Sequence, residues 1–216
     1  MKSTLDLKEI EKRAFRSTYE DGLWDIYYGL MVILMAAILT RPDEGYGWLN
    51  LIFLTGGYAA AYLLFRAGKK YITIPRLGQV KFGEIRKQKN RKMSIILGVF
   101  LFLQVLLLAG TALALVDPKV GSWLDDQLAG KNELLLVSLV ASMILCVGMS
   151  IVTYFSDFTR GYYIAIMMAV AVFLMLFLER PLFPLLAGLL IIIPGLVLLW
   201  RFLNKYPLPK KGVEDE

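Results

Sequence analysis

Residues 66–92 read RAGKKYITIPRLGQVKFGEIRKQKNRK, and this basic stretch decides how the rest of the chain is interpreted. Ten of its residues are Lys or Arg, and Glu84 is the only acidic one. Strongly apolar runs flank it on both sides. Positive charge next to apolar runs is typical of the cytoplasmic loops that orient membrane proteins. We therefore interpret residues 66–92 as a basic cytoplasmic loop of a polytopic membrane protein.

The composition of the whole chain points the same way. Of its 216 residues 57% are hydrophobic, against about half in an ordinary soluble domain. The apolar residues gather in runs of about 17 to 24, the length at which a helix crosses about 30 Å of hydrocarbon. A helix also satisfies its own backbone polar groups within lipid. These features predict an all-α polytopic membrane protein.

The apolar runs predict six transmembrane helices arranged as three helical hairpins. The expected spans are about 23–40, 48–65, 93–116, 134–154, 161–178 and 182–203. The corresponding organisation is a cytoplasmic amphipathic segment (1–21), hairpin 1 (22–65), the basic loop (66–92), hairpin 2 (93–154), hairpin 3 (155–203) and a cytoplasmic tail (204–216). Pro194 and Gly195 predict a kink in the last span.

The basic loop carries its own local pattern. Residues 71–74 and 79–82 are β-branched or alternating in polarity, and the turn signal at 75–78 separates them. This pattern predicts a small β-hairpin or an extended arm. From Glu84 the pattern becomes helical, and we expect one helix to run from there into the third span.

The distribution of positive charge predicts the orientation. With six spans, 20 Lys and Arg lie on the side that holds both termini and the basic loop. The opposite side holds four, Arg41, Lys119, Lys131 and Arg180. Because cytoplasmic loops carry an excess of Lys and Arg, we expect both termini to lie in the cytoplasm. The expected location is the cytoplasmic (inner) membrane.

Residues 22–42 align with residues 161–181 at an offset of 139, with a Gly at the start and Arg-Pro at the end of each. Internal repeats are common in transporters. Hydrophobic helices with Gly starts and Pro stops also resemble one another by composition, so the sequence leaves true duplication open.

A first candidate site lies at the cytoplasmic mouth of the first span, where residues 20–29 combine three carboxylates with three aromatic rings. We single out Asp21, Asp25 and Tyr28 as a possible polar site, with Arg160 or the basic loop as partner. The plainer interpretation weighs more: carboxylates at a helix N-terminus contribute about 0.3–1 kcal/mol, and Trp24 belongs to the interfacial belt.

The basic loop is the second candidate. The residues expected to contact lipid or a partner are Arg76, Lys81, Arg86, Lys87, Lys89, Arg91 and Lys92. Each such charge near an anionic membrane surface contributes about 1 kcal/mol. The alternative is that they determine topology only. Nucleic-acid binding is not expected, because the segment is short, tethered to the membrane and lacks a recognisable module.

Several chemistries have little support. The chain has no histidine and a single cysteine, Cys146, which excludes imidazole ligands and an intrachain disulfide. It has no metal-protease, nucleophile-elbow or phosphate-loop motif, so we predict no metal and no cofactor. The central thirds of the spans hold no charged residue, which argues against a proton-driven carrier. Polar residues within the spans, such as Gln104 and Ser138, suit helix–helix packing.

We therefore expect an integral membrane scaffold or accessory subunit whose basic cytoplasmic face contacts anionic lipid headgroups or a cytosolic partner. The expected membrane partner is a second copy in a homodimer or a companion membrane subunit. One alternative is a small transporter or channel built from repeated hairpins. A further alternative is a membrane enzyme that modifies lipid headgroups, although the sequence favours a non-enzymatic role.

Overall fold

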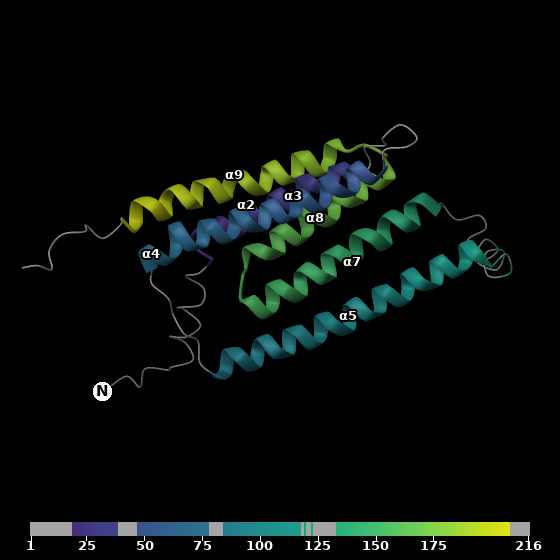
Figure 1. Cartoon of the computed structure of the whole chain (residues 1–216), viewed down its shortest axis with the longest axis horizontal. Coiled ribbons are helices and arrows are strands. Elements are labelled where there is room, and N and C mark those ends of the chain that lie inside the picture. Colours follow the sequence, from purple (N-terminus) through teal and green to yellow (C-terminus); the bar gives the residue numbers. More distant parts are fainter. Residues whose placement is uncertain are drawn as a thin grey trace, which may run out of the picture. The chain divides into compact units, whose positions relative to one another are not determined.

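A computed structural model describes residues 19–38, 47–77, 84–117 and 133–207, together with Lys119 and Ser122, and the regular structure in them is helical. The helices are α2 (Leu23–Met35), α3 (Gly47–Gly68), α4 (Ile74–Leu77), α5 (Glu84–Val116), α7 (Glu133–Ser156), α8 (Arg160–Phe177) and α9 (Leu182–Lys205). A 3-10 turn (Ala36–Ile38) extends α2, and a π-helical turn (Lys69–Thr73) joins α3 to α4. The helices form two compact units, α2, α3, α4 and α9 in the first and α5, α7 and α8 in the second (Figure 1).

Within the described residues, five helical segments are long and apolar enough to cross a membrane. They are Leu51–Arg76, Arg86–Leu113, Leu134–Ser156, Arg160–Phe177 and Leu182–Lys205. This agrees with the predicted all-α membrane architecture. The helix α2 has 13 residues and therefore spans only about 20 Å. The sixth span, which the sequence places at 23–40, stays a prediction.

The predicted β-hairpin is wrong in the half that the structure describes. Residues 71–74 are helical, because α3 continues through the π-helical turn into α4; residues 79–82 lie outside the described ranges. Adding residues to an existing helix costs little, whereas an isolated two-stranded hairpin is marginal in water. The other local expectation is confirmed, since α5 runs unbroken for 33 residues from Glu84.

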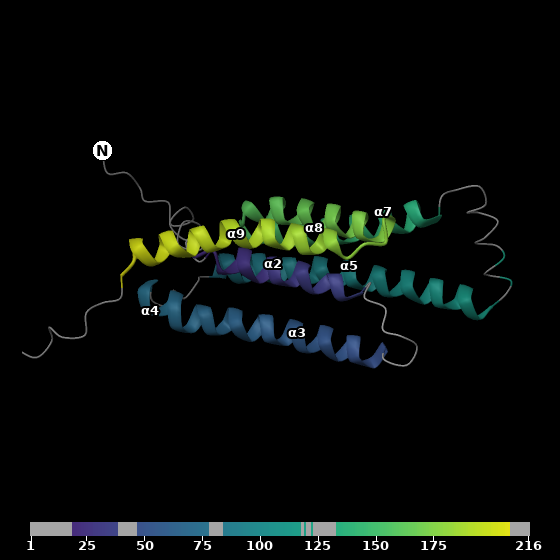
Figure 2. The same ribbon diagram turned by 90° about the horizontal axis from the view of Figure 1, so that it is seen from above.

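Paired glycines bring α2 and α9 together in the first unit, where the two helices lie side by side (Figure 2). A Cβ atom built on Gly29 would stand 2.9 Å from the carbonyl oxygen of Gly188. One built on Gly195 would stand 3.1 Å from the carbonyl oxygen of Gly22. The glycines are seven residues apart on each helix and therefore share one face. Only glycine permits this backbone approach, so these positions set the antiparallel pairing of α2 with α9.

In the second unit a tight turn joins α7 to α8. The N–H of Phe158 donates to the carbonyl of Thr153 at 3.2 Å, and the N–H of Asp157 donates to that of Tyr154 at 3.4 Å. This is a Schellman ending, in which Asp157 takes the left-handed conformation (φ 52°) that glycine usually occupies. Asp tolerates this conformation better than most side chains.

The main helix partners differ from those of three sequential hairpins. The helix α2 packs mainly against α9, although it also contacts α3. In the second unit α7 packs mainly against α8, and α5 lies along α7 with fewer contacts. The hairpin arrangement therefore stays a prediction.

Candidate functional site

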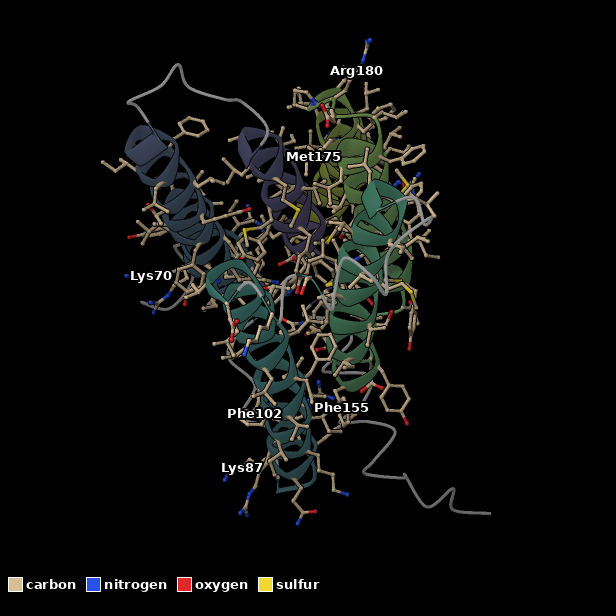
Figure 3. The ribbon with its side chains drawn as sticks, turned by 90° about the vertical axis from the view of Figure 1, so that its right-hand side faces the viewer. Lys70, Lys87, Phe102, Phe155, Met175 and Arg180 are labelled. Atoms are coloured by element: carbon tan, nitrogen blue, oxygen red, sulfur yellow. The ribbon has the colours of Figure 1, made fainter. Side chains whose placement is uncertain are left out.

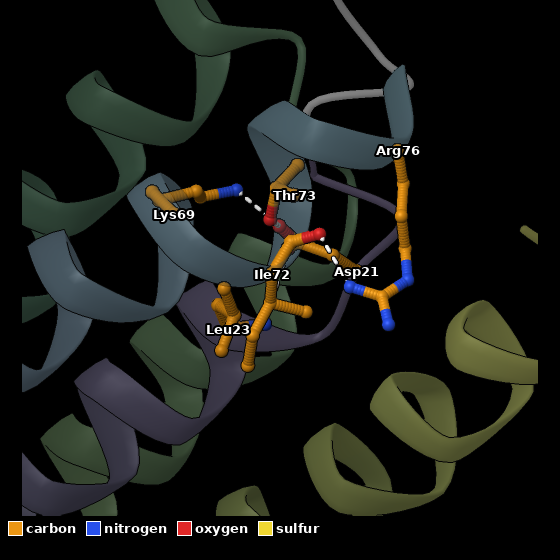
Figure 4. Close-up of polar contacts among 6 residues, drawn as sticks. All are labelled: Asp21, Leu23, Lys69, Ile72, Thr73 and Arg76. Atoms are coloured by element: carbon orange, nitrogen blue, oxygen red, sulfur yellow. Dashed lines mark hydrogen bonds and ion pairs between the residues drawn. The ribbon is translucent and has the colours of Figure 1, made fainter. Parts of the chain in front are cut away.

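Asp21 is the centre of a buried polar cluster in the first unit. Its side chain is fully buried and accepts hydrogen bonds from Lys69 Nζ at 2.6 Å and from Thr73 Oγ1 at 2.5 Å. Its other oxygen accepts from the backbone N–H of Leu23 at 3.1 Å (Figure 4). A carboxylate in this setting is stabilised by a cation and two further donors, so it can remain charged while buried. The cluster ties the start of α2 to the end of α3.

The π-helical turn places the two donors. Lys69 and Thr73 are four residues apart and project from the same side of the widened helix, and the N–H of Ile74 donates to the carbonyl of Lys69 in the i→i+5 pattern. Pro75 follows directly. Proline has no N–H to donate, and its ring displaces the carbonyl four residues earlier, which favours local widening of the helix. The sequence signal for this site was therefore Pro75, which is equally compatible with a turn.

Aromatic rings surround the ammonium group of Lys69. Its Nζ lies 6.0 Å from the ring centroid of Trp24 and 5.7 Å from that of Phe65. The Trp24 and Phe65 rings are themselves 4.4 Å apart, and Tyr28 stacks on Trp24 at 5.7 Å. A cation over aromatic faces gains about 0.5–2 kcal/mol. Lys69 is therefore held by a carboxylate and by two rings.

The remaining members of the predicted polar site, Asp25 and Arg160, belong to different units. Asp25 is buried in α2, and a Cβ built on Gly195 of α9 would stand 2.9 Å from its Cβ. It is near enough to Lys69 to act on it electrostatically. Arg160 belongs to the second unit, where its guanidinium lies 5.6 Å from the ring centroid of Phe158. A pairing of Asp25 with Arg160 stays a prediction.

Two of the predicted lipid-contact residues form an ion-pair cluster with Asp157. Arg86 Nη1 lies 3.0 Å and Lys89 Nζ 2.6 Å from Asp157 Oδ2, and the side chain of Arg86 is 7% exposed. Burial acts to raise the pKa of Asp157, but the hydrogen bonds and positive charges of Lys89 and Arg86 outweigh it, so this pKa lies below its ordinary value of 3.8. The cluster fastens the first turns of α5 to the α7–α8 turn.

The other basic residues have different surroundings. Lys87, Arg91 and Lys92 are exposed on the first turns of α5, and Figure 3 shows Lys87 extending outward. Arg76 Nη1 donates to the carbonyl of Ile72 at 2.9 Å, and Lys81 lies outside the described residues.

The apolar part of α5 has little protein around it. None of its most apolar 18-residue window is buried, in contrast to 39% of the corresponding window of α8. Leu101, Phe102 and Leu108 are each more than half exposed. In the described part of the chain, α5 packs against α7, where the ring of Phe100 approaches Gly148. The helix α5 therefore combines an exposed cationic end with an uncovered apolar length.

Among the described residues, no three Asp, Glu, Cys or His side chains gather into a group that would hold a metal ion. Comparison of the chain with protein-family models, curated proteins and solved structures found no match. The function is therefore argued from the geometry alone.

Proposed function

We propose that the protein is a membrane interaction or accessory subunit and that the N-terminal end of α5 binds anionic lipid headgroups. The observation that supports this most directly is the exposure of Lys87, Arg91 and Lys92 next to the uncovered apolar length of α5. A helix of this kind places its cations at headgroup level when its apolar part lies in hydrocarbon.

The greater exposure of Lys87, Arg91 and Lys92 favours these three cations over Arg86 and Lys89. Arg86 and Lys89 already share the carboxylate of Asp157, which lowers their attraction for a second anion. At about 1 kcal/mol for each exposed cation near an anionic surface, the three supply about 3 kcal/mol, or roughly 150-fold in affinity.

Neutralising the three cations tests the proposal. Lys87→Gln/Arg91→Gln/Lys92→Gln should lose most of the anionic lipid that the wild-type protein retains after mild extraction, measured by native mass spectrometry. The matched control, Lys70→Gln/Arg201→Gln/Lys205→Gln, removes three other exposed cations and should keep most of it. Equal losses from both variants, with unchanged thermal unfolding, would refute a site on α5.

The lipid site requires a particular topology, which is part of the proposal. We infer that α2 is a sixth span, that three hairpins cross the inner membrane and that both termini are cytoplasmic. In a Cys146→Ala background, Gln88→Cys should be protected from an impermeant thiol reagent in intact cells, and Asp125→Cys should react. The reverse pattern would invert the topology.

Transport is the second candidate, supported by the burial of Asp25 within α2 against α9. Ionisable groups inside membrane bundles often mark ion pathways, and Pro194 of α9 lies next to the contact. Asp25→Asn should abolish a proton or monovalent-cation flux into proteoliposomes, whereas exposed Glu20→Gln should not. Absence of flux from the wild-type protein, or equal flux from both variants, would remove this candidate.

A further inference from the structure

Two of the exposed cations of α5 share one side of the helix with small and apolar residues further along it. At about 100° per residue, a single arc of about 80° contains Lys87, Arg91, Ser94, Gly98 and Phe102. All five residues are exposed, and Figure 3 shows Lys87 and Phe102 on the same side of α5. We call these five residues the outer face of α5.

The outer face is separate from the side of α5 that packs within the second unit. Arg86 and Lys89 pair with Asp157, and the ring of Phe100 approaches Gly148 of α7. The three α5 residues in these contacts lie on average about 150° around the helix from the outer face. The outer face is therefore directed away from the contacts that α5 makes with α7 and with the α7–α8 turn.

Small residues keep the outer face flat between its cations and Phe102. Gly98 has no side chain, and a Cβ built on it would meet no atom within 4 Å. The hydroxyl of Ser94 donates to the carbonyl of Asn90 at 3.1 Å, so it is satisfied within α5. Gly98 lies about 10 Å beyond Arg91 along the helix. Because the headgroup region of a leaflet is about 5–7 Å thick, Gly98 lies beside the first carbons of the acyl chains when Arg91 is at phosphate level.

We propose that the outer face of α5 binds one anionic diacyl phospholipid lengthwise, with its phosphate at Lys87 and Arg91 and an acyl chain along Gly98 and Phe102. A guanidinium and an ammonium group both donate charge-assisted hydrogen bonds to phosphate. An acyl chain gains dispersion contacts along a flat apolar surface. The inference rests on the proposed lipid binding by α5, and it adds the path of the acyl chain. It also divides the cations, because Lys92 lies about 100° around the helix from Arg91 and outside this site.

A fluorophore at position 102 tests which lipid covers the outer face. In a Cys146→Ala background, labelled Phe102→Cys in phosphatidylcholine vesicles should be quenched preferentially by phosphatidylglycerol brominated at mid-chain, compared with equally brominated phosphatidylcholine. The preference should be between about 5-fold, for one engaged cation, and about 30-fold, for two. Leu103→Cys is the matched control: Phe102 and Leu103 are 60% and 57% exposed and nearly equal in depth, but they point about 100° apart. An equal preference at the two positions would overturn the proposal.

Removal of the two cations tests the position of the phosphate. Lys87→Gln/Arg91→Gln should abolish the preference at position 102, whereas Lys92→Gln should leave it intact. Soluble glycerol 1-phosphate carries the same phosphate without acyl chains and should not compete with the brominated lipid. Competition by glycerol 1-phosphate, or an unchanged preference in Lys87→Gln/Arg91→Gln, would contradict a lipid held at both ends.

Substitution of Gly98 tests the acyl path. Gly98→Phe should remove most of the preference at position 102, because its ring occupies the flat stretch. Gly110→Phe is the matched control, since a Cβ at Gly110 also meets no atom within 4 Å but lies about 120° around α5. If Lys87→Gln/Arg91→Gln abolishes the preference and Gly98→Phe does not, the headgroup site stands and the acyl path is refuted. If neither variant changes lipid binding, the proposed function fails as well.

Discussion

The ion-pair cluster around Asp157 makes the sharpest prediction about stability. We expect Asp157→Asn to destabilise the second unit by removing the carboxylate that Arg86 and Lys89 share. Asparagine tolerates the left-handed conformation at this position (φ 52°), so the change removes charge without straining the turn. The effect therefore reports the ion pairs rather than the backbone.

The magnitude follows from the burial of the two cations. Arg86 is 7% exposed, and the loss of a hydrogen bond to a charged group at such a site costs about 1.5–3 kcal/mol. Lys89 is 30% exposed, so its pair contributes at most about 1 kcal/mol. An asparagine oxygen still accepts one hydrogen bond and offsets part of the loss. We expect a net decrease of about 2–3 kcal/mol in the free energy of unfolding.

The assay is equilibrium unfolding by denaturing detergent, followed by circular dichroism. The control is Glu179→Gln, which neutralises an exposed carboxylate at a second left-handed position and should change stability by less than about 0.5 kcal/mol. The double variant Arg86→Gln/Asp157→Asn removes the buried guanidinium together with its carboxylate. Its loss of stability should therefore be smaller than the sum of the losses in the two single variants. Equal effects of Asp157→Asn and Glu179→Gln would refute the reasoning.

The same cluster predicts a dependence on pH. The pKa of Asp157 is lowered in the folded protein, so its contribution to stability is fully present above the ordinary, unfolded pKa of 3.8. It is lost as the pH falls through the lower folded value. The difference in stability between wild type and Asp157→Asn should therefore be constant between about pH 5 and 8 and shrink below about pH 4. A difference that grows on acidification would contradict the assigned direction.

Two further predictions concern the first unit, and the same unfolding assay measures both. Gly29→Ala should cost about 1–3 kcal/mol of stability, because the new Cβ meets the Gly188 carbonyl. Gly56→Ala, whose Cβ enters open space, should be neutral or slightly stabilising. Equal effects of the two substitutions would contradict the close α2–α9 contact. Asp21→Asn should cost about 2–4 kcal/mol, because Lys69 loses its buried carboxylate; Glu20→Gln, an exposed neighbour, should change stability little, and a neutral Asp21→Asn would show that the cluster does not hold α2 to α3.

Local sequence patterns were sufficient to predict the long apolar helices, but they were not sufficient to predict the structure of the basic segment. The length of an apolar run can be counted directly in the sequence, so the long spans and the unbroken α5 were predictable. Residues 71–74 read equally well as a strand, because Pro75 terminates either structure. The helix was decided by continuation from α3 and by the bond from Thr73 to Asp21, which lies 52 residues away in the sequence.

The candidate sites show the same division. Asp21 was predicted to belong to a polar site, but the sequence did not distinguish its partner Lys69 from the nine other cations in the basic stretch. Asp157 was not predicted at all, since a single Asp between two spans looks like any polar turn residue. Arg86 and Lys89 were assigned to lipid or partner contact, and their ion pairs with Asp157 were not anticipated.

By itself, the sequence determined that long apolar helices alternate with basic polar segments, because length, hydropathy and charge are properties of contiguous residues. The tertiary structure alone decided that Gly29 meets Gly188, that Asp21 holds Lys69 and that Asp157 holds Arg86. Each of these contacts joins residues dozens of positions apart. It depends on how closely two backbones approach, and no pattern within a single helix contains that distance.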